Sequence, residues 1–400
     1  MMTTRSRFLR VSTVVGALAL TLPAVASCSS SPQAGTHASN GETISVVAST
    51  TQICDYVTQI ASGGEELAFT RTGADGATEE LGADPSSAST HLTLTCLLAP
   101  NASAHEHEMT AAQSKALSEA DMFLVSGVDL EHFLDDAVKA TGFHGTMVVT
   151  SGVLTADELD DMDARKAKEK DLPYTVDRGV AAVEVATWPF PPAEGESEPE
   201  FRYDPHVWTS PANALIQVRN IGAALEKAAP ASAETLRNHV DGYVKRLTEL
   251  DQWAQESLDS VPSASRVLFT SHDAFGYFSD HYGVSFEGAA LSDFNAQQDA
   301  TAQKIQETAD QVKASGAPAI FAENSNNPKS VEKVAALAGV RAVIGDEALY
   351  GDSLGTAGSD GETYIGSVAH NVTNLTLAWS GTVAPLPQDL SSWAPKETIK

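Results

Sequence analysis

The first half of the chain alternates short apolar runs with stretches in which apolar residues recur every three or four positions. Ile44–Ala48 is a β-branched run, and Ile53–Ile60 behind it has the apolar spacing of a helix. Strands that alternate with helices at this interval predict βαβ units and a parallel sheet. The further candidates are the strands Leu92–Leu98 and Met122–Ser126 and the helices Thr110–Ala120 and Leu130–Ala140.

Two segments interrupt this alternation. Gly63–Ser89 has the composition of an acidic segment on the protein surface. Leu154–Tyr203 opens with a group of aspartates and glutamates and closes on a Trp-Pro-Phe-Pro-Pro run followed by alternating glutamates. A polar, proline-bearing segment of this length inside a compact chain is usually mobile or functional. We therefore expect an acidic insertion at about 154–203, which either gathers cations around a cleft or is a solvated spacer.

A long amphipathic helix is predicted over residues 233–260, because its apolar residues fall on one face. At 1.5 Å per residue it would be roughly 40 Å long, enough to connect two lobes. Strand–helix alternation resumes behind it, from the strand Val267–Thr270 to a last helix at Thr363–Trp379. The predicted fold is α/β, with two βα lobes of mostly parallel sheet joined by one long rigid helix. The N-terminal lobe is expected over 44–232 and the C-terminal lobe over 261–400.

The N-terminus has the order of a secretory signal. Three arginines precede an apolar run over residues 11–25 that is too short to span a membrane comfortably. The run leads into Val-Ala-Ser before Cys28, which resembles the lipobox read by lipoprotein-processing enzymes. We expect a lipoprotein signal peptide at 1–27, a lipid on Cys28 and a flexible tether over 28–43. The chain would then lie outside the cytoplasm, anchored to the membrane; a plain secreted protein with a free Cys28 is the alternative.

The net charge and the cysteine count exclude several classes of function. The 25 Lys and Arg residues are outnumbered by 53 Asp and Glu residues, which gives a formal net charge of -28. This balance excludes a nucleic-acid binder that works through backbone phosphates. The 3 cysteines are too few for a disulfide framework or a Cys-rich metal module. In an oxidising compartment Cys54 and Cys96 could form a disulfide, or they could remain two buried free thiols.

Histidines near predicted strand ends are candidates for a metal site. His105 and His107 follow the second strand candidate, and His272 directly follows a later one. His206 lies in a proline-stiffened turn, and Asp352 lies in a Gly/Ser loop behind the last strand. Singly, each of them is more often a surface or turn residue. Because ligands of open α/β sheets bind where the strands end, three imidazoles and one carboxylate on four loops could enclose a tetrahedral metal site.

Around these residues the chain resembles a known family. It is similar to the metal-binding lipoproteins of bacterial zinc and manganese ABC importers, the cluster A-I solute-binding proteins. The likeness runs from about Ile44 to Leu377, and four motifs occur in the family's order. The matching segments are His105-Glu106-His107-Glu108-Met109-Thr110, Asp204-Pro205-His206-Val207-Trp208, Ser271-His272-Asp273-Ala274-Phe275-Gly276-Tyr277-Phe278, and Asp352-Ser353-Leu354-Gly355 with Thr363-Tyr364 and Asn371-Val372.

The first motif departs from the family pattern. His107 and Met109 stand where the family has tyrosine and proline, and Ser103-Ala104 stands where Asp-Pro usually precedes the motif. Both His105 and His107 therefore remain candidates for the first ligand.

The resemblance implies a carrier and not an enzyme. In the cleft between the lobes, His105, His206, His272 and Asp352 would bind Zn(II) as the transported ligand, and the protein, plausibly a monomer, would deliver it to an ABC permease. In that family the position of His272 is commonly histidine in zinc carriers and glutamate in manganese carriers. Imidazole suits zinc, whereas manganese favours a larger share of oxygen ligands. Zn(II) is the expected ion, with Mn(II) or another divalent metal as the alternative.

Two other functions compete with this one. A zinc-dependent hydrolase would activate water on a three-histidine site, but Asp352 would fill the fourth position and the chain has no HExxH segment. A surface adhesin or sensor would use the metal structurally and would unfold when it is removed. Glu131 and Glu323 also lie near predicted strand ends. Each could accept a hydrogen bond from an imidazole of the site, or be an ordinary surface or capping carboxylate.

Overall fold

The computed structural model describes residues 42–63, 66–105, 107–192, 197–199, 201–287 and 302–400. The expected signal peptide, Cys28 and the expected tether up to residue 41 lie outside this part of the chain. Glu42 and Thr43 already belong to the first strand, so the expected tether boundary at 43 is wrong. Within the described residues no helix combines the length and the apolar character that crossing a membrane requires.

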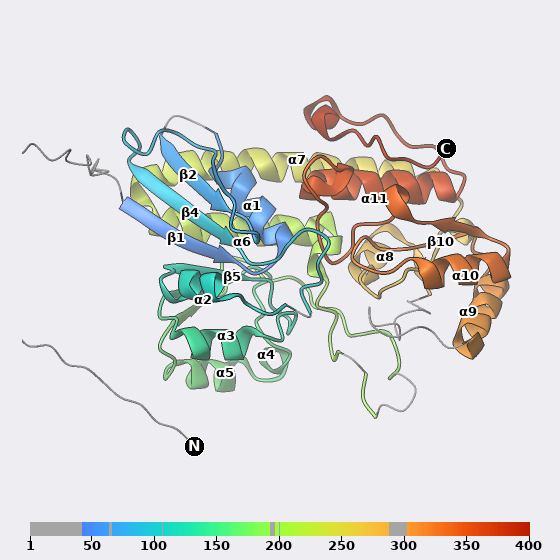
Figure 1. The fold of residues 1–400 in the computed structure, drawn as a ribbon, viewed down its shortest axis with the longest axis horizontal. Coiled ribbons are helices and arrows are strands. Elements are labelled where there is room, and N and C mark those ends of the chain that lie inside the picture. The colour runs from blue at the N-terminus through green and yellow to red at the C-terminus, as the bar shows by residue number, and fades with distance from the viewer. Residues whose placement is uncertain (1–41, 64–65, 106, 193–196, 200, 288–301) are drawn as a thin grey trace, which may run out of the picture. The chain divides into compact units, whose positions relative to one another are not determined.

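A seven-stranded sheet forms the first lobe, in the order β3-β2-β4-β1-β5-β6-β7 (Figure 1). Each neighbouring pair is parallel except β2 and β3, which are antiparallel. The parallel sheet predicted from strand–helix alternation is confirmed. The strands are β1 (Glu42–Ala48), β2 (Leu67–Thr72), β3 (Thr78–Glu80), β4 (Thr90–Cys96), β5 (Met122–Val125), β6 (Thr146–Val149) and β7 (Thr175–Asp177).

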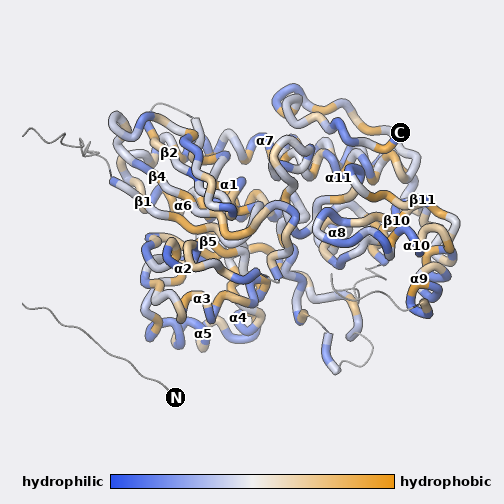
Figure 2. The backbone as a smooth tube through the Cα atoms, in the orientation of Figure 1, coloured by the Kyte–Doolittle hydropathy of each residue, from blue (hydrophilic) through white to orange (hydrophobic). Residues whose placement is uncertain are grey.

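Both faces of this sheet are covered by helices. These are α1 (Thr51–Ala61), α2 (Ala111–Ser118), α3 (Leu134–Thr141), α6 (Pro211–Ala228) and α7 (Ala233–Asp259). On β1, Val46 packs into the core that holds α1, α6 and α7, whereas Val47 packs into a separate core with α2 and α3. Leu124 and Phe123 of β5 divide between the two cores in the same way. Strands buried on both faces are rich in apolar residues, as in β5, which is apolar and buried at every position and hydrophobic in Figure 2.

Two segments that we expected to be acidic surface structure contribute strands to the sheet. Within 63–89, β2 lies between β3 and β4 with Leu67–Phe69 buried. Within 154–203, α4 (Asp157–Asp160) and α5 (Met162–Glu169) precede β7, which pairs with β6. The prediction of a non-core segment is therefore wrong for these parts. Strands as short as the three residues of β7 carry too little alternation to be recognised in a sequence.

Some acids of the second segment are paired internally. Arg178 Nη2 lies 2.6 Å from Glu158 Oε1 and 2.5 Å from Glu169 Oε1. The Glu158 side chain is fully buried. These two carboxylates therefore hold α4 and α5 to the end of β7 and are not free to gather cations.

The second lobe has shorter strands with the same parallel pairing. β8 pairs with β9 and β10 pairs with β11, and a parallel bridge between Thr270 and Phe321 connects the two pairs. Its elements are β8 (Val267–Leu268), α8 (Gly276–Tyr282), β9 (Ser285–Phe286), α9 (Ala302–Ser315), β10 (Ala319–Phe321), α10 (Lys329–Ala338), β11 (Arg341–Val343) and α11 (Tyr364–Ala378).

Helix α7 runs along both lobes, beside α1 and α6 in the first and beside α11 in the second (Figure 1). One continuous hydrophobic core crosses this junction. Within it the ring of Tyr56 on α1 lies 6.4 Å from that of Tyr243 on α7 and 5.1 Å from that of Tyr364 on α11. Asp55 accepts a hydrogen bond of 2.9 Å from the backbone N–H of Tyr364 at the start of α11. Packed side chains therefore join the lobes in addition to the chain itself.

The disulfide between Cys54 and Cys96 should contribute measurably to stability. It joins α1 to the end of β4, with the Cα atoms 5.6 Å apart and a separation of 42 positions along the chain. A loop of this length limits the unfolded chain by about 4 kcal/mol in the chain-entropy model. We expect a Cys54→Ser, Cys96→Ser double variant to lose up to that free energy of unfolding in urea titrations. The reduced unaltered protein should match the variant, and an unchanged urea midpoint in both would contradict the expectation.

Candidate metal centre

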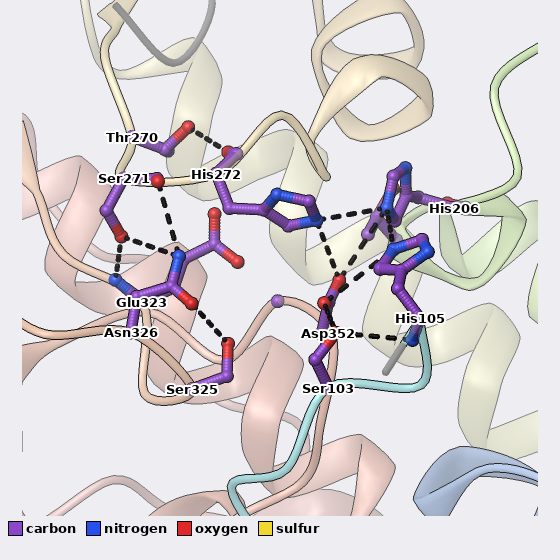
Figure 3. A network of polar contacts seen from close by, with 12 residues as sticks. Ser103, His105, His206, Thr270, Ser271, His272, Glu323, Ser325, Asn326 and Asp352 are labelled. Atoms are coloured by element: carbon purple, nitrogen blue, oxygen red, sulfur yellow. Dashed lines mark hydrogen bonds and ion pairs between the residues drawn. The ribbon is translucent and has the colours of Figure 1, made fainter. Parts of the chain in front are cut away.

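Four loops from both lobes meet at one point (Figure 3). His105 lies between β4 and α2, and His206 directly precedes the short 3-10 helix Val207–Thr209 in front of α6. His272 lies between β8 and α8, and Asp352 lies in the loop that follows β11. Among the described residues these four form the one group of three or more His, Cys, Asp or Glu side chains whose donor atoms all lie within 4.8 Å of one another.

The donor atoms face one another at short range. His206 Nε2 lies 3.1 Å from His105 Nε2 and 3.2 Å from His272 Nε2. Asp352 Oδ1 lies 3.1 Å from His272 Nε2 and 3.6 Å from His206 Nε2, and Asp352 Oδ2 lies 3.8 Å from His105 Nε2. Bonds of 2.0–2.1 Å to a central ion would place tetrahedral ligands about 3.3 Å apart. The cluster is therefore close to the size of a tetrahedral zinc site.

The cluster is largely shielded from water. The exposed fraction of the side chain is 0% for His206, 3% for Asp352, 10% for His105 and 16% for His272. Two of the four side chains are thus buried, and the two others retain limited access to solvent. The ring of Phe201, itself buried, lies 5.4 Å from that of His105 and covers it from the side of the 154–203 segment.

Asp204 determines which nitrogen of His206 can bind an ion. Its Oδ1 lies 2.8 Å from Nδ1 of His206 and also accepts the backbone N–H of His206 at 2.9 Å. A carboxylate can only accept, so Nδ1 carries the proton and Nε2 presents its lone pair to the cluster. Carboxylates in this role orient metal-binding imidazoles. Asp204 was not among the predicted site residues, although it stands two positions before His206 in the same motif.

The backbone of the Asp352 loop is fixed by the other lobe. Gln52 Nε2 on α1 donates to the carbonyl of Asp352 at 3.0 Å, and Trp208 Nε1 donates to the carbonyl of Gly351 at 3.0 Å. Gly351 also makes room for a neighbouring acid, because a Cβ there would lie 1.8 Å from Glu323 Oε2. The ligand loop of the second lobe is therefore positioned by contacts with the first.

The charges of the cluster depend on one another. Burial lowers the pKa of His105 to about 3, so this imidazole is neutral at physiological pH. Burial also acts to lower the pKa of His272, but the Asp352 carboxylate outweighs it and raises that pKa to about 10. Burial would raise the pKa of Asp352, yet His272 and His105 hold it well below its usual range. Without an ion, Asp352 is a buried carboxylate neutralised mainly by protonated His272.

The remaining candidates occupy different positions. The ring of His107 packs against Phe133 at 5.2 Å, and its buried Nε2 has no hydrogen-bond partner among the described residues. His107 is not part of the four-residue cluster. The buried carboxylate of Glu131 accepts the hydroxyl of Ser49 at 2.8 Å and the backbone N–H of Ser126 at 2.6 Å. Glu131 therefore holds the ends of β1 and β5, and the expectation that it orients an imidazole is replaced by this structural role.

Glu323 is buried next to the cluster, and Figure 3 shows its carboxylate beside His272. Neither of its carboxylate oxygens has a hydrogen-bond partner in the described part of the chain. Burial raises its pKa well above the usual range, against the opposing effect of His272. Burial thus disfavours a second negative charge beside Asp352.

Replacing Asp204 by asparagine should weaken metal binding about 10- to 100-fold, because the amide lacks the negative charge and can turn its NH2 toward Nδ1, so the proton of His206 is no longer fixed there. The measurement is competition for Zn(II) against a chelator of known affinity. Asp251→Asn is a matched control, since Asp251 makes the same 2.8 Å contact to an imidazole, that of His281, outside the cluster. Equal effects of the two substitutions would contradict the role of Asp204.

Metal binding should release about one proton per ion near neutral pH. His105 is already neutral there, whereas His272, with its pKa raised to about 10, must lose a proton before Nε2 can bind. Affinity should therefore rise about tenfold per unit between about pH 6 and 8. Calorimetry in buffers of different ionisation enthalpy measures the proton count. An affinity independent of pH over this range would contradict the expectation.

Comparison with known proteins places this geometry in a family. The profile of the ZnuA family, zinc-uptake complex component A periplasmic, matches residues 46–378. The manganese-binding lipoprotein MntA of Bacillus subtilis (strain 168) is 28% identical over 291 residues, 72% of this chain and 83% of that protein. The zinc-binding protein TroA of Treponema pallidum (strain Nichols) is 28% identical over 285 residues, 70% of this chain and 80% of that protein.

A solved structure of the periplasmic zinc-binding protein TroA from Treponema pallidum has the same fold. It superimposes with a TM-score of 0.59 at 24% sequence identity and covers 85% of this chain and 99% of that one. The α/β architecture with two lobes is shared. The chain belongs to the ZnuA family, whose members are metal-binding solute-binding proteins of ABC importers and not enzymes.

Proposed function

We propose that this protein captures one Zn(II) ion outside the cytoplasm and delivers it to an ABC permease. The observation that carries the proposal is the donor set of His105, His206, His272 and Asp352, with separations close to those of a tetrahedral site. Three imidazoles and one carboxylate suit zinc better than manganese, which favours a larger share of oxygen ligands. The relatives are named for manganese or zinc, so the ion is inferred from the ligands and not from the family.

The charge balance supports capture of a divalent cation. An ion that displaces the proton of His272 meets three neutral imidazoles and the single negative charge of Asp352. The resulting formal charge of the site is +1, in a chain of formal net charge -28. Glu323, whose pKa is raised by burial, is proposed to adjust the hydrogen bonding around His272 when the proton leaves.

The cellular setting is part of the proposal. The relative MntA is named as a lipoprotein, and Cys28 follows a lipobox-like segment. We propose a lipid on Cys28 that keeps the protein at the outer side of the membrane, as a monomer, where it can dock on its permease. Mass spectrometry of the membrane-extracted protein would detect the lipid, which a Cys28→Ala variant should lack.

Competition between equimolar Zn(II) and Mn(II) on the metal-stripped protein tests the proposed cargo. We expect one tightly held zinc, and His206→Ala or His272→Ala should reduce its affinity by at least about 100-fold, because each removes a ligand. His281→Ala is the control, since His281 lies outside the cluster and contacts Asp251. Preference for manganese would identify the alternative cargo of the same family, and equal effects of all three variants would refute the site.

The same assay decides the first ligand. His105→Ala should weaken zinc as strongly as the loss of His206, whereas His107→Ala should leave it nearly unchanged, because only His105 reaches the cluster. A larger effect at His107 would reverse the assignment.

A further inference from the structure

We infer that Ser103 makes Asp352 a one-oxygen ligand, limits the site to four protein donors and thereby favours Zn(II) over Mn(II). This inference rests on the proposed function, because it concerns the selectivity of the same site. Ser103 is a positioning residue here, since it acts on the ion through Asp352.

The hydrogen bonds of Asp352 separate its two oxygens. Ser103 Oγ donates to Oδ2 at 2.8 Å. Oδ1 forms an ion pair of 3.1 Å with His272 Nε2 and lies 3.6 Å from His206 Nε2. Oδ1 is therefore the oxygen closer to the imidazoles, while Oδ2, 3.8 Å from His105 Nε2, is engaged by the hydroxyl.

The direction of the hydroxyl proton follows from a second contact. The backbone N–H of His105 donates to Ser103 Oγ at 3.3 Å, so the serine oxygen acts there as an acceptor. Its own proton is then available for the carboxylate, which can only accept. Figure 3 shows Ser103 between His105 and Asp352, where it links the first ligand loop to the fourth.

The carboxylate cannot easily turn both oxygens to the ion by moving its loop. Gln52 and Trp208 hold the backbone carbonyls of Asp352 and Gly351. In a two-oxygen Asp352, Oδ2 would have to share its lone pairs between the ion and the hydroxyl of Ser103, which weakens its donation to the ion. The hydrogen bond from Ser103 is charge-assisted and thus stronger than a neutral one.

The aromatic residues around the cluster also limit how many further groups could bind the ion. The ring of Phe201 lies 5.4 Å from that of His105 and 6.1 Å from that of His206, and the ring of Trp188 lies 6.1 Å from that of His206. These aromatic rings place apolar surface behind the imidazoles. They carry no atom that could bind a metal ion, because the indole nitrogen bears a hydrogen and acts only as a hydrogen-bond donor. Zinc is satisfied by four tetrahedral ligands, whereas manganese prefers octahedral oxygen-rich sites. A site held at four donors therefore penalises manganese more than zinc.

The first arm of the test uses the unaltered, metal-stripped protein with Co(II) as the probe. Four-coordinate tetrahedral Co(II) absorbs visible light much more strongly than six-coordinate Co(II), so the spectrum reports the coordination number directly. We expect intense bands. Weak bands typical of six-coordinate cobalt would overturn the inference, whatever the variants do.

The second arm removes the hydroxyl. Ser103→Ala frees Oδ2, so the preference for Zn(II) over Mn(II) should shrink about tenfold, the effect of losing one charge-assisted hydrogen bond, and the cobalt bands should weaken. Ser103→Thr keeps the hydroxyl and should behave like the unaltered protein. Ser392→Ala, at an exposed serine, is the matched control. An unchanged preference and spectrum in Ser103→Ala would overturn the inference.

Failure of this inference and failure of the proposed function give different results. If the unaltered protein binds neither zinc nor cobalt tightly, the proposed function fails and the inference falls with it. If zinc is bound tightly and depends on His272, but Ser103→Ala equals the unaltered protein, the role of Ser103 alone is refuted. Should Ser103→Ala not fold, as judged by circular dichroism, the cobalt spectra of the unaltered protein and of Ser103→Thr decide.

Discussion

A carboxylate buried among three imidazoles is the constraint on which the rest of this structure depends. An isolated charge in such a place would be very costly, and Asp352 is tolerated because His272 carries the compensating proton while no ion is bound. The same arrangement prepares the site for a divalent cation, since the ion takes over the role of that proton. The separations of 3.1–3.8 Å between the donors show that little reorganisation is needed.

Holding four loops at these distances requires that the two lobes be fixed relative to each other. The continuous core around Tyr56, Tyr243 and Tyr364 does this at the junction of α1, α7 and α11. Gln52 and Trp208 of the first lobe hold the Asp352 loop of the second. Wide opening of the lobes would break these contacts together. Smaller movements of the individual loops, above all those of the partly exposed His105 and His272, are the less costly way to admit an ion.

Much of this arrangement could be predicted from the sequence, and the exceptions have physical reasons. β1 and β5 have apolar residues on both faces, β4 alternates apolar and polar residues, and α7 has a long regular apolar face, so their positions followed from the sequence pattern. β7 was missed because it has only three residues, and β2 because it lies in a segment rich in acids and glycines. Several acids near β7 are internally paired, as with Glu158 and Arg178. The histidine ligands were recognisable by their motifs. Ser103 and Asp204 were not identified as functional, because their importance lies in hydrogen bonds to Asp352 and His206 that depend on the folded loops.

The four donors come from positions 105, 206, 272 and 352, so they are spread widely along the described chain. No fragment shorter than residues 105–352 contains the complete set, and an unfolded chain would have to close very long loops to bring the donors together. Tight retention of an ion is consequently a signature of an intact, completely folded molecule. If the proposed site holds the ion, a copy cut by a protease between these loops would lose the ion once the pieces separate, and so would not hold scarce metal away from intact copies.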